Sequence, residues 1–109
     1  MNEDDLTYIQ KVQVVTHAWR MEMWPDLEVW QQFAGFVGEI AEFIEILFKG
    51  EFYDDEWDDR EELKKEAGDV IIYFLGVLSL LDLDVHECIE AAREKNDDRD
   101  WEEHQRQVE

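Results

Sequence analysis

The run EELKKEAGDVIIYFLGVLSLLD at residues 61–82 constrains the fold more than any other part of the chain. It has helical character and turns apolar on nearly every side over Val70–Leu81. Glu66 and Asp69 are three residues apart and therefore share one helix face, which continues through Tyr73 into apolar side chains. A buried carboxylate must be protonated, paired with a cation or bound to a metal. The run predicts a buried helix that carries two carboxylates on its face.

The composition favours one all-helical domain over residues 1–109. A chain of 109 residues can bury a single hydrophobic core, and 45% hydrophobic residues with five Trp argue against disorder. There is one Pro, at position 25, and the Gly residues are few, so the turn chemistry of a β-sheet is nearly absent.

Helical periodicity and capping signals divide the chain into four helices. We expect the first helix at residues 4–24, capped by Asp4 or Asp5 and ended by Pro25, and the second at residues 27–49, capped by Asp26 and stopped by Gly50. The capping box Asp59-x-x-Glu62 opens the third helix. The fourth helix runs from the capping box Asp84-x-x-Glu87 to about Arg106. Short connections predict an antiparallel four-helix bundle. Residues 102–109 are polar, and we expect them to form a frayed tail.

Apolar side chains at helical spacing give the expected core. In order along the chain they are Leu6, Ile9, Val12, Val15, Ala18, Trp19 and Met23; Trp30, Phe33, Val37, Ile40, Ala41, Ile44, Leu47 and Phe48; and Val85, Cys88, Ile89 and Ala92. The third helix is apolar over more than one face, so a single bundle leaves part of its apolar surface exposed. We therefore expect a homodimer or homotetramer that covers this surface. The aromatics of the loop at 51–60 (Phe52, Tyr53, Trp57) either tuck against helix ends or cover a ligand.

The charge balance limits the possible partners. With 30 acidic and 10 basic side chains the formal net charge is −20, so a nucleic-acid polymer is not expected as a partner. A chain this acidic can bind a nucleotide only if divalent cations mediate the contact. Alternatively, the acidic side chains form a solvated surface that suits high salt. The single Cys88 and the lack of a signal-like N-terminus fit the cytoplasm. Val70–Leu81 is too short to span a bilayer.

Acidic side chains from two neighbouring helices form the candidate site. Glu39 and Glu42 on the second helix and Glu66 and Asp69 on the third are oxygen donors that suit a hard cation, Mg²⁺ first and Mn²⁺ next. Like charges this close repel unless a cation is present. A di-iron centre is disfavoured because it needs Glu-x-x-His pairs, which none of the three histidines provides: His17, His86 and His104.

Three segments carry a family resemblance: GEIAEFIE at 38–45, EELKKEAGDVIIYF at 61–74 and EKNDDR at 94–99. They resemble the MazG-like all-α nucleoside triphosphate pyrophosphohydrolases, including dCTP pyrophosphatase-type members, over about residues 27–101. The resemblance implies Mg²⁺-dependent cleavage between the α and β phosphates, giving a nucleoside monophosphate and pyrophosphate. It places Glu39, Glu66 and Asp69 at metal and catalytic positions. Its implied substrate-binding residues are Tyr73, Lys95, Asn96 and Arg99.

Phe36 departs from the family pattern. Close relatives have a GExGE motif, whereas this chain reads AGFVGE, with Phe36 at a ligand position. Phe cannot bind Mg²⁺, so Glu42 takes over a ligand role, the site binds fewer metals, or the enzyme is degenerate. Three hypotheses follow: a pyrophosphohydrolase, a non-catalytic relative that binds a nucleotide or a protein, and a helical oligomerisation module whose acids are solvated.

Overall fold

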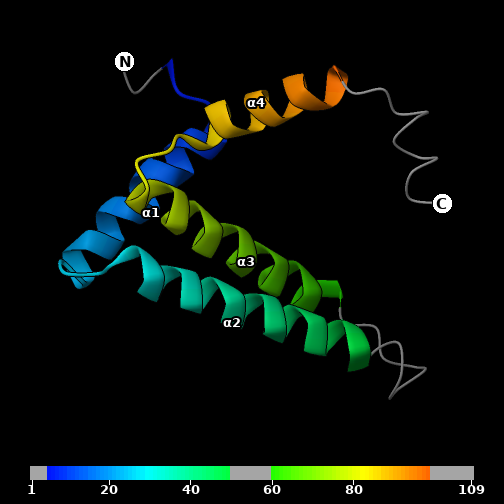
Figure 1. The fold of residues 1–109 in the computed structure, drawn as a ribbon. Coiled ribbons are helices and arrows are strands. Elements are labelled where there is room, and N and C mark those ends of the chain that lie inside the picture. The colour runs from blue at the N-terminus through cyan, green and yellow to red at the C-terminus, as the bar shows by residue number, and fades with distance from the viewer. Residues whose placement is uncertain (1–4, 50–59, 99–109) are drawn as a thin grey trace.

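A computed structural model describes residues 5–49 and 60–98. In these ranges the chain forms helices and no strand, which confirms the predicted all-helical class (Figure 1). The helices are α1 (Tyr8–Met23), α2 (Val29–Phe48), α3 (Arg60–Leu80) and α4 (Val85–Asp97). None of them has the length and apolar character needed to cross a membrane.

The first helix begins later than expected because a capping box sets its start. Thr7, and not Asp4 or Asp5, is the N-cap: its hydroxyl accepts a hydrogen bond from the Gln10 N–H at 3.3 Å. The Gln10 side chain in turn accepts from the Thr7 N–H at 2.9 Å. The helix ends at Met23, two residues before Pro25, as predicted.

The caps of α2 and α4 differ in how well the sequence predicted them. Glu28, and not Asp26, is the N-cap of α2, and the Gln31 side chain accepts from its N–H at 2.9 Å. Asp84 caps α4 as predicted and accepts from the Glu87 N–H at 2.9 Å. The expected cap Asp59, the stop Gly50 and residues 99–109 lie outside the described residues.

The helices form an antiparallel pair with a second pair packed at one end. α2 and α3 run side by side over most of their length, and this is the most extensive contact in the fold (Figure 1). α1 packs on the C-terminal part of α3 and also on α4, whose far end points away from the α2–α3 pair. The antiparallel packing that the sequence predicted is therefore most complete between α2 and α3.

Polar side chains hold α1 against the α3–α4 turn. Gln10, Gln13 and Arg20 are 8%, 6% and 5% exposed and form what we name the α1 polar seam. The Gln13 amide donates to the Leu83 carbonyl at 2.8 Å and accepts from the Val85 N–H at 2.9 Å. It thereby satisfies a donor that α4 leaves unpaired at its N-terminus. The Gln10 amide donates to both Asp84 carboxylate oxygens at 3.0 Å.

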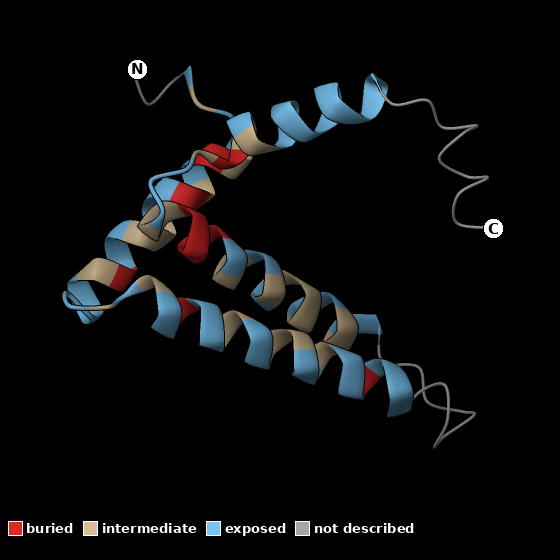
Figure 2. Cartoon of the chain, in the orientation of Figure 1, coloured by how far each residue is buried: buried red, intermediate tan, exposed pale blue. Residues whose placement is uncertain are grey.

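The hydrophobic core is small and lies beside this seam. Leu75, Leu78 and Val85 are its buried members, and they pack against side chains from α1 and α4: Ile9, Val12 and Cys88. Figure 2 shows most of the buried residues gathered where α1 meets α3 and the start of α4, with others on α2. The core expected on Ile9, Val12, Val85 and Cys88 is therefore found, with Cys88 half-buried.

Most of the other expected core positions face outward in the single chain, although Leu6 and Ile40 are half-buried. On α1, Val15, Trp19 and Met23 are 63%, 52% and 54% exposed. Six expected core residues of α2 are also exposed: Trp30, Phe33, Val37, Ile44, Leu47 and Phe48. The expected burial is wrong for a single copy because α2 turns its opposite face to α3, where the buried Gln32 amide donates to the Tyr73 carbonyl at 3.0 Å. Ala18, Ala41, Ile89 and Ala92 are exposed as well.

Two glycines of α3 give a matched test of this packing. A Cβ at Gly76 would lie 2.6 Å from Arg20 Nη1 and 2.5 Å from Gln32 Nε2, whereas a Cβ at Gly68 would meet nothing within 4 Å. We expect Gly68→Ala to stabilise the fold by about 0.5–1 kcal/mol through helix propensity. Gly76→Ala should destabilise it by about 1–3 kcal/mol through overpacking. Urea unfolding measures both; equal effects would contradict the close approach of α1 and α2 to Gly76.

Candidate metal centre

Three glutamates from α2 and α3 converge. One carboxylate oxygen from each of Glu39, Glu42 and Glu66 lies within 4.8 Å of the others. Glu39 and Glu42 are three residues apart on α2, and the antiparallel pairing brings Glu66 of α3 beside them. We name these three residues the carboxylate centre.

Two oxygens of the carboxylate centre are sealed from solvent without a hydrogen-bond partner. They are Oε2 of Glu39 and Oε2 of Glu66; both residues are half-buried, whereas Glu42 is exposed. A buried acceptor without a donor is unfavourable, because desolvation is not repaid. A cation or a proton at the centre would satisfy both oxygens.

The electrostatics of the centre also favour a proton or a cation. Burial raises the pKa of Glu39, and the charges of Glu42, Asp69 and Glu66 and a hydrogen bond with Glu42 raise it further. Burial also raises the pKa of Glu66, with the charges of Glu42, Asp69 and Glu62 adding to it. Each ionised carboxylate thus makes the next harder to ionise.

Asp69 and Tyr73 lie next to the carboxylate centre. Asp69 is exposed and is not among the three residues with mutually close oxygens, but its charge raises the pKa of both Glu39 and Glu66. Tyr73 is half-buried one turn further along α3. Its ring covers Gly35 of α2, where an added Cβ would lie 2.8 Å from Tyr73 Cε1.

The predicted substrate-binding residues of α4 do not join this group in the single chain. Lys95 and Asn96 are exposed near the far end of α4, which packs on α1 and extends away from α2 and α3 (Figure 1). Arg99 lies outside the described residues. The structure therefore brings together Glu39, Glu42 and Glu66, with Asp69 and Tyr73 adjacent.

Phe36 makes a packing contact one turn before Glu39. It is half-buried, and its ring centroid lies 5.0 Å from that of Phe74 and 6.1 Å from that of Phe33. The ring therefore links α2 to α3 at the position where the family resemblance expects a carboxylate. Its role in this chain is apolar packing beside the centre.

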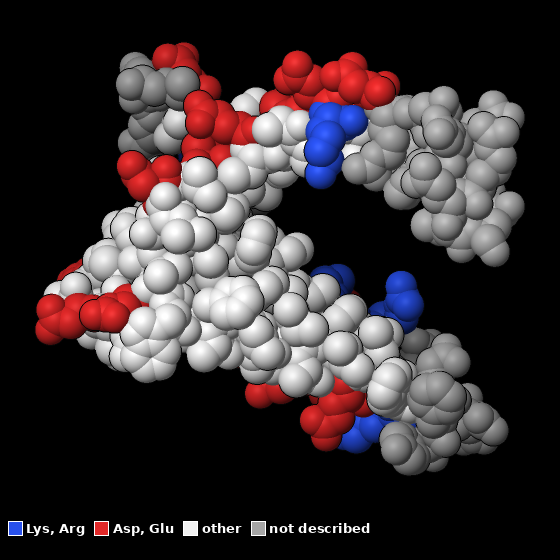
Figure 3. Space-filling model, in the orientation of Figure 1, with Lys and Arg blue, Asp and Glu red and all other residues white. Residues whose placement is uncertain are grey.

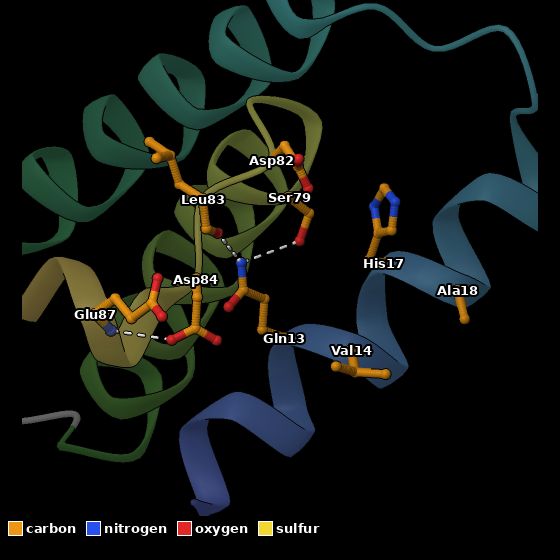
Figure 4. Close-up of a pocket in the computed structure, with 9 residues that line it drawn as sticks. All are labelled: Gln13, Val14, His17, Ala18, Ser79, Asp82, Leu83, Asp84 and Glu87. Atoms are coloured by element: carbon orange, nitrogen blue, oxygen red, sulfur yellow. Dashed lines mark hydrogen bonds between the residues drawn. The ribbon is translucent and has the colours of Figure 1, made fainter. Parts of the chain in front are cut away.

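The sequence pattern did not predict a second polar region, which lies between α1 and the α3–α4 turn. A pocket of about 470 Å³ opens between α1 and the α3–α4 turn, and Figure 4 shows His17 of α1 facing Ser79 and Asp82 across it. His17 Nδ1 is buried without a partner. Polar residues at helical spacing along α1 were the available signal, but the apolar residues beside them dominated the prediction of the core face.

The donor set of the carboxylate centre determines which ligand it suits. All of its ligand atoms are carboxylate oxygens, which match Mg²⁺ or Mn²⁺ better than softer metals. Comparison with known proteins adds nothing to these residues, since no family model, curated protein or solved structure matches the chain.

The raised pKa values predict how pH acts on stability. A folded-state pKa above the ordinary value of 4.5 means that the folded state binds protons more tightly than the unfolded chain. Stability should therefore fall as pH rises from about 4.5 through the raised pKa values of Glu39 and Glu66, and added Mg²⁺ should reduce the fall. Melting temperature against pH, with and without Mg²⁺, measures this.

Glu45→Gln is the control for Glu66→Gln, because it removes the same charge from an exposed position on α2. We expect Glu66→Gln to flatten the pH dependence and weaken the Mg²⁺ effect, and Glu45→Gln to leave both. Identical behaviour of the two variants would show that overall charge repulsion, and not the carboxylate centre, sets the pH dependence.

Proposed function

We propose that this chain is a divalent-cation-dependent nucleoside triphosphate pyrophosphohydrolase. The observation that carries the proposal is the convergence of Glu39, Glu42 and Glu66, two of which have a sealed oxygen without a partner. These three residues hold Mg²⁺, for which Mn²⁺ can substitute, and Asp69 adds negative charge beside it. The resemblance of residues 38–45 and 61–74 to MazG-like enzymes supports the same reaction.

The proposed reaction cleaves the substrate between its α and β phosphates. A water oxygen attacks the α phosphorus, the bond from that phosphorus to the bridging oxygen breaks, and the products are a nucleoside monophosphate and pyrophosphate. When bound, the cation offsets phosphate charge and makes the water more acidic. A carboxylate of the centre that does not bind the cation orients the water and accepts its proton.

We assign Tyr73 to the substrate because it borders the centre. Lys95 and Asn96 can contact phosphates or sugar at this centre only in an assembly where α4 of one copy reaches the centre of another, since α4 extends away from α2 and α3 in its own chain. Arg99, which the resemblance assigns to the same role, lies outside the described residues. The lone Cys88 is compatible with a reducing cytoplasm, where we place the activity.

The activity is tested with a panel of ribo- and deoxyribonucleoside triphosphates, first with Mg²⁺ and then with Mn²⁺, by measuring pyrophosphate and orthophosphate separately. We expect pyrophosphate release that Glu66→Gln and Asp69→Asn each lower by more than about 100-fold, because metal binding or water orientation is lost. Glu45→Gln should retain the activity. Full activity in both variants would refute the assignment.

Phe36→Glu should raise activity or metal affinity if Phe36 replaces a ligand.

A non-catalytic nucleotide- or protein-binding module is the second candidate. The observation that favours it is Phe36, whose ring packs on Phe74 where the resemblance expects a metal ligand. In that case nucleotide with Mg²⁺ raises the melting temperature without any turnover, because ligand binding stabilises the folded state.

We further propose that the chain acts as a homodimer or homotetramer. Trp30, Phe33, Val37, Ile44 and Leu47 recur along α2 at intervals of three, four or seven residues and are all exposed, by 39% to 64%. Such a stripe is typical of a helix that packs against another helix. Figure 3 shows a face of the molecule whose middle, over α2 and α3, carries neither acidic nor basic side chains.

Val37→Asp tests this assembly by placing a charge in the middle of the α2 stripe. We expect the wild-type chain to sediment as a dimer or larger, and Val37→Asp to sediment as a smaller species with a lower melting temperature, because a charge would be buried at the contact. A monomeric wild-type chain would contradict the assembly.

A further inference from the structure

Arg20 is a buried cation without a counter-ion. It is 5% exposed, and its side chain forms no hydrogen bond or ion pair with any residue in the described part of the chain. Its Nη1 is sealed from solvent without a partner. By contrast, the exposed Lys64 and Arg93 pair with Glu61 and Glu90 at 3.0 and 3.2 Å. An acid-rich chain has thus left its buried arginine unpaired.

The neighbours of Arg20 supply donors and an aromatic face. The guanidinium lies over the Tyr73 ring, with its carbon 5.6 Å from the ring centroid. Arg20 Nη1 and Gln32 Nε2 both approach the surface of Gly76, where an added Cβ would lie within 2.6 Å of each. The Gln32 amide is itself held by its bond to the Tyr73 carbonyl. The guanidinium is therefore fixed in place by side chains that do not neutralise it.

The missing partner of Arg20 must be an acceptor and an anion. A guanidinium has five N–H donors and no acceptor, and it stays charged in proteins. Burial lowers the pKa of Arg20 and the nearby Tyr73 opposes this shift. A planar fork of donors matches the oxygens of a phosphate group, to which arginine binds through two parallel hydrogen bonds.

Tyr73 connects Arg20 to the carboxylate centre. The Arg20 guanidinium lies over the Tyr73 ring. The same ring also covers Gly35 of α2, which is one turn before Glu39. On α3, Glu66 of the carboxylate centre precedes Tyr73 by seven residues, which is about 10 Å along the helix axis. A polyphosphate bound at the centre can therefore extend along Tyr73 toward Arg20.

We propose that Arg20 binds a phosphate group of the substrate, the one farthest from the cation at the carboxylate centre. This rests on the proposed function for its substrate class, a nucleoside polyphosphate. Arg20 is then the basic residue for polyphosphate that α4 does not supply within the same chain. It is buried without a counter-ion because the substrate is the counter-ion.

Tripolyphosphate with Mg²⁺ is the probe, and Arg20→Met the main variant. Calorimetry should show that the wild-type chain binds tripolyphosphate and that Arg20→Met weakens this binding by about 10- to 100-fold, the effect of losing a charged hydrogen-bonded pair. The unliganded melting temperature of Arg20→Met should equal or exceed that of wild type, because an unpaired buried charge is removed. Arg93→Gln removes an exposed arginine and should bind like wild type.

Arg20→Lys keeps the charge without the fork and should bind with intermediate affinity, so the inference stays testable if Arg20→Met folds poorly. Unchanged tripolyphosphate affinity in either variant would overturn the inference. A change of oligomeric state without a change of affinity would also overturn it, since the anion would then be a carboxylate of a second copy.

Nucleotide kinetics separate this inference from the proposed function. If Arg20 binds phosphate in the ground state, Arg20→Lys raises KM more than it lowers kcat. If hydrolysis is sensitive to Glu66→Gln and indifferent to Arg20, the function stands and the inference fails. If no nucleotide is hydrolysed but tripolyphosphate binding still depends on Arg20, the phosphate site stands without the reaction.

Discussion

The Gln13 side chain is the contact on which the arrangement of the helices depends. With 6% exposure it bonds the Leu83 carbonyl, the Ser79 hydroxyl and the Val85 N–H, so one amide joins α1, the end of α3 and the start of α4. An apolar side chain there would leave the turn's backbone groups without partners. Residues seven positions apart on a helix share one face. Because Gln13 faces inward, Arg20, seven residues later, also lies in the interior, beside Tyr73 and Gly76.

The same inversion governs α2. Gln32, Gly35 and Glu39 lie along the face of α2 that meets α3, while Phe33 and Val37 point to solvent. The inward face is mixed, since it also carries Phe36 and the buried Ile46, and it buries less apolar surface in a single copy than the exposed stripe would. This orientation is nevertheless what places Glu39 beside Glu66. Packing the apolar stripe against another copy would recover the lost burial without moving the carboxylates, since the two faces of the helix are opposite. One helix, α2, can therefore contribute to the carboxylate centre and to the proposed assembly at the same time.

Sequence reasoning predicted the helices well and their faces poorly. The end of α1 before Pro25 and the cap at Asp84 follow from local chemistry, which a short stretch of chain determines. The inward faces of α1 and α2 do not, because both helices carry apolar and polar side chains on different faces. Contacts of α1 with the α3–α4 turn and of α2 with α3 select between those faces. Glu39 and Glu66 could be placed together from their spacing, but Arg20 could not, because an isolated arginine in a helix ordinarily faces water.

Opposite unbalanced charges lie on either side of Tyr73. The carboxylate centre has too much negative charge for its burial, as the raised pKa values of Glu39 and Glu66 express, and Arg20 has a positive charge without a partner. The two groups do not neutralise each other, because the Tyr73 side chain and about two turns of α3 separate them. A complex of a divalent cation with a polyphosphate has the complementary order of charge, positive toward the carboxylates and negative toward the guanidinium. In the reaction we propose, each half of this complex improves the binding of the other, so the proposal accounts for both unbalanced groups.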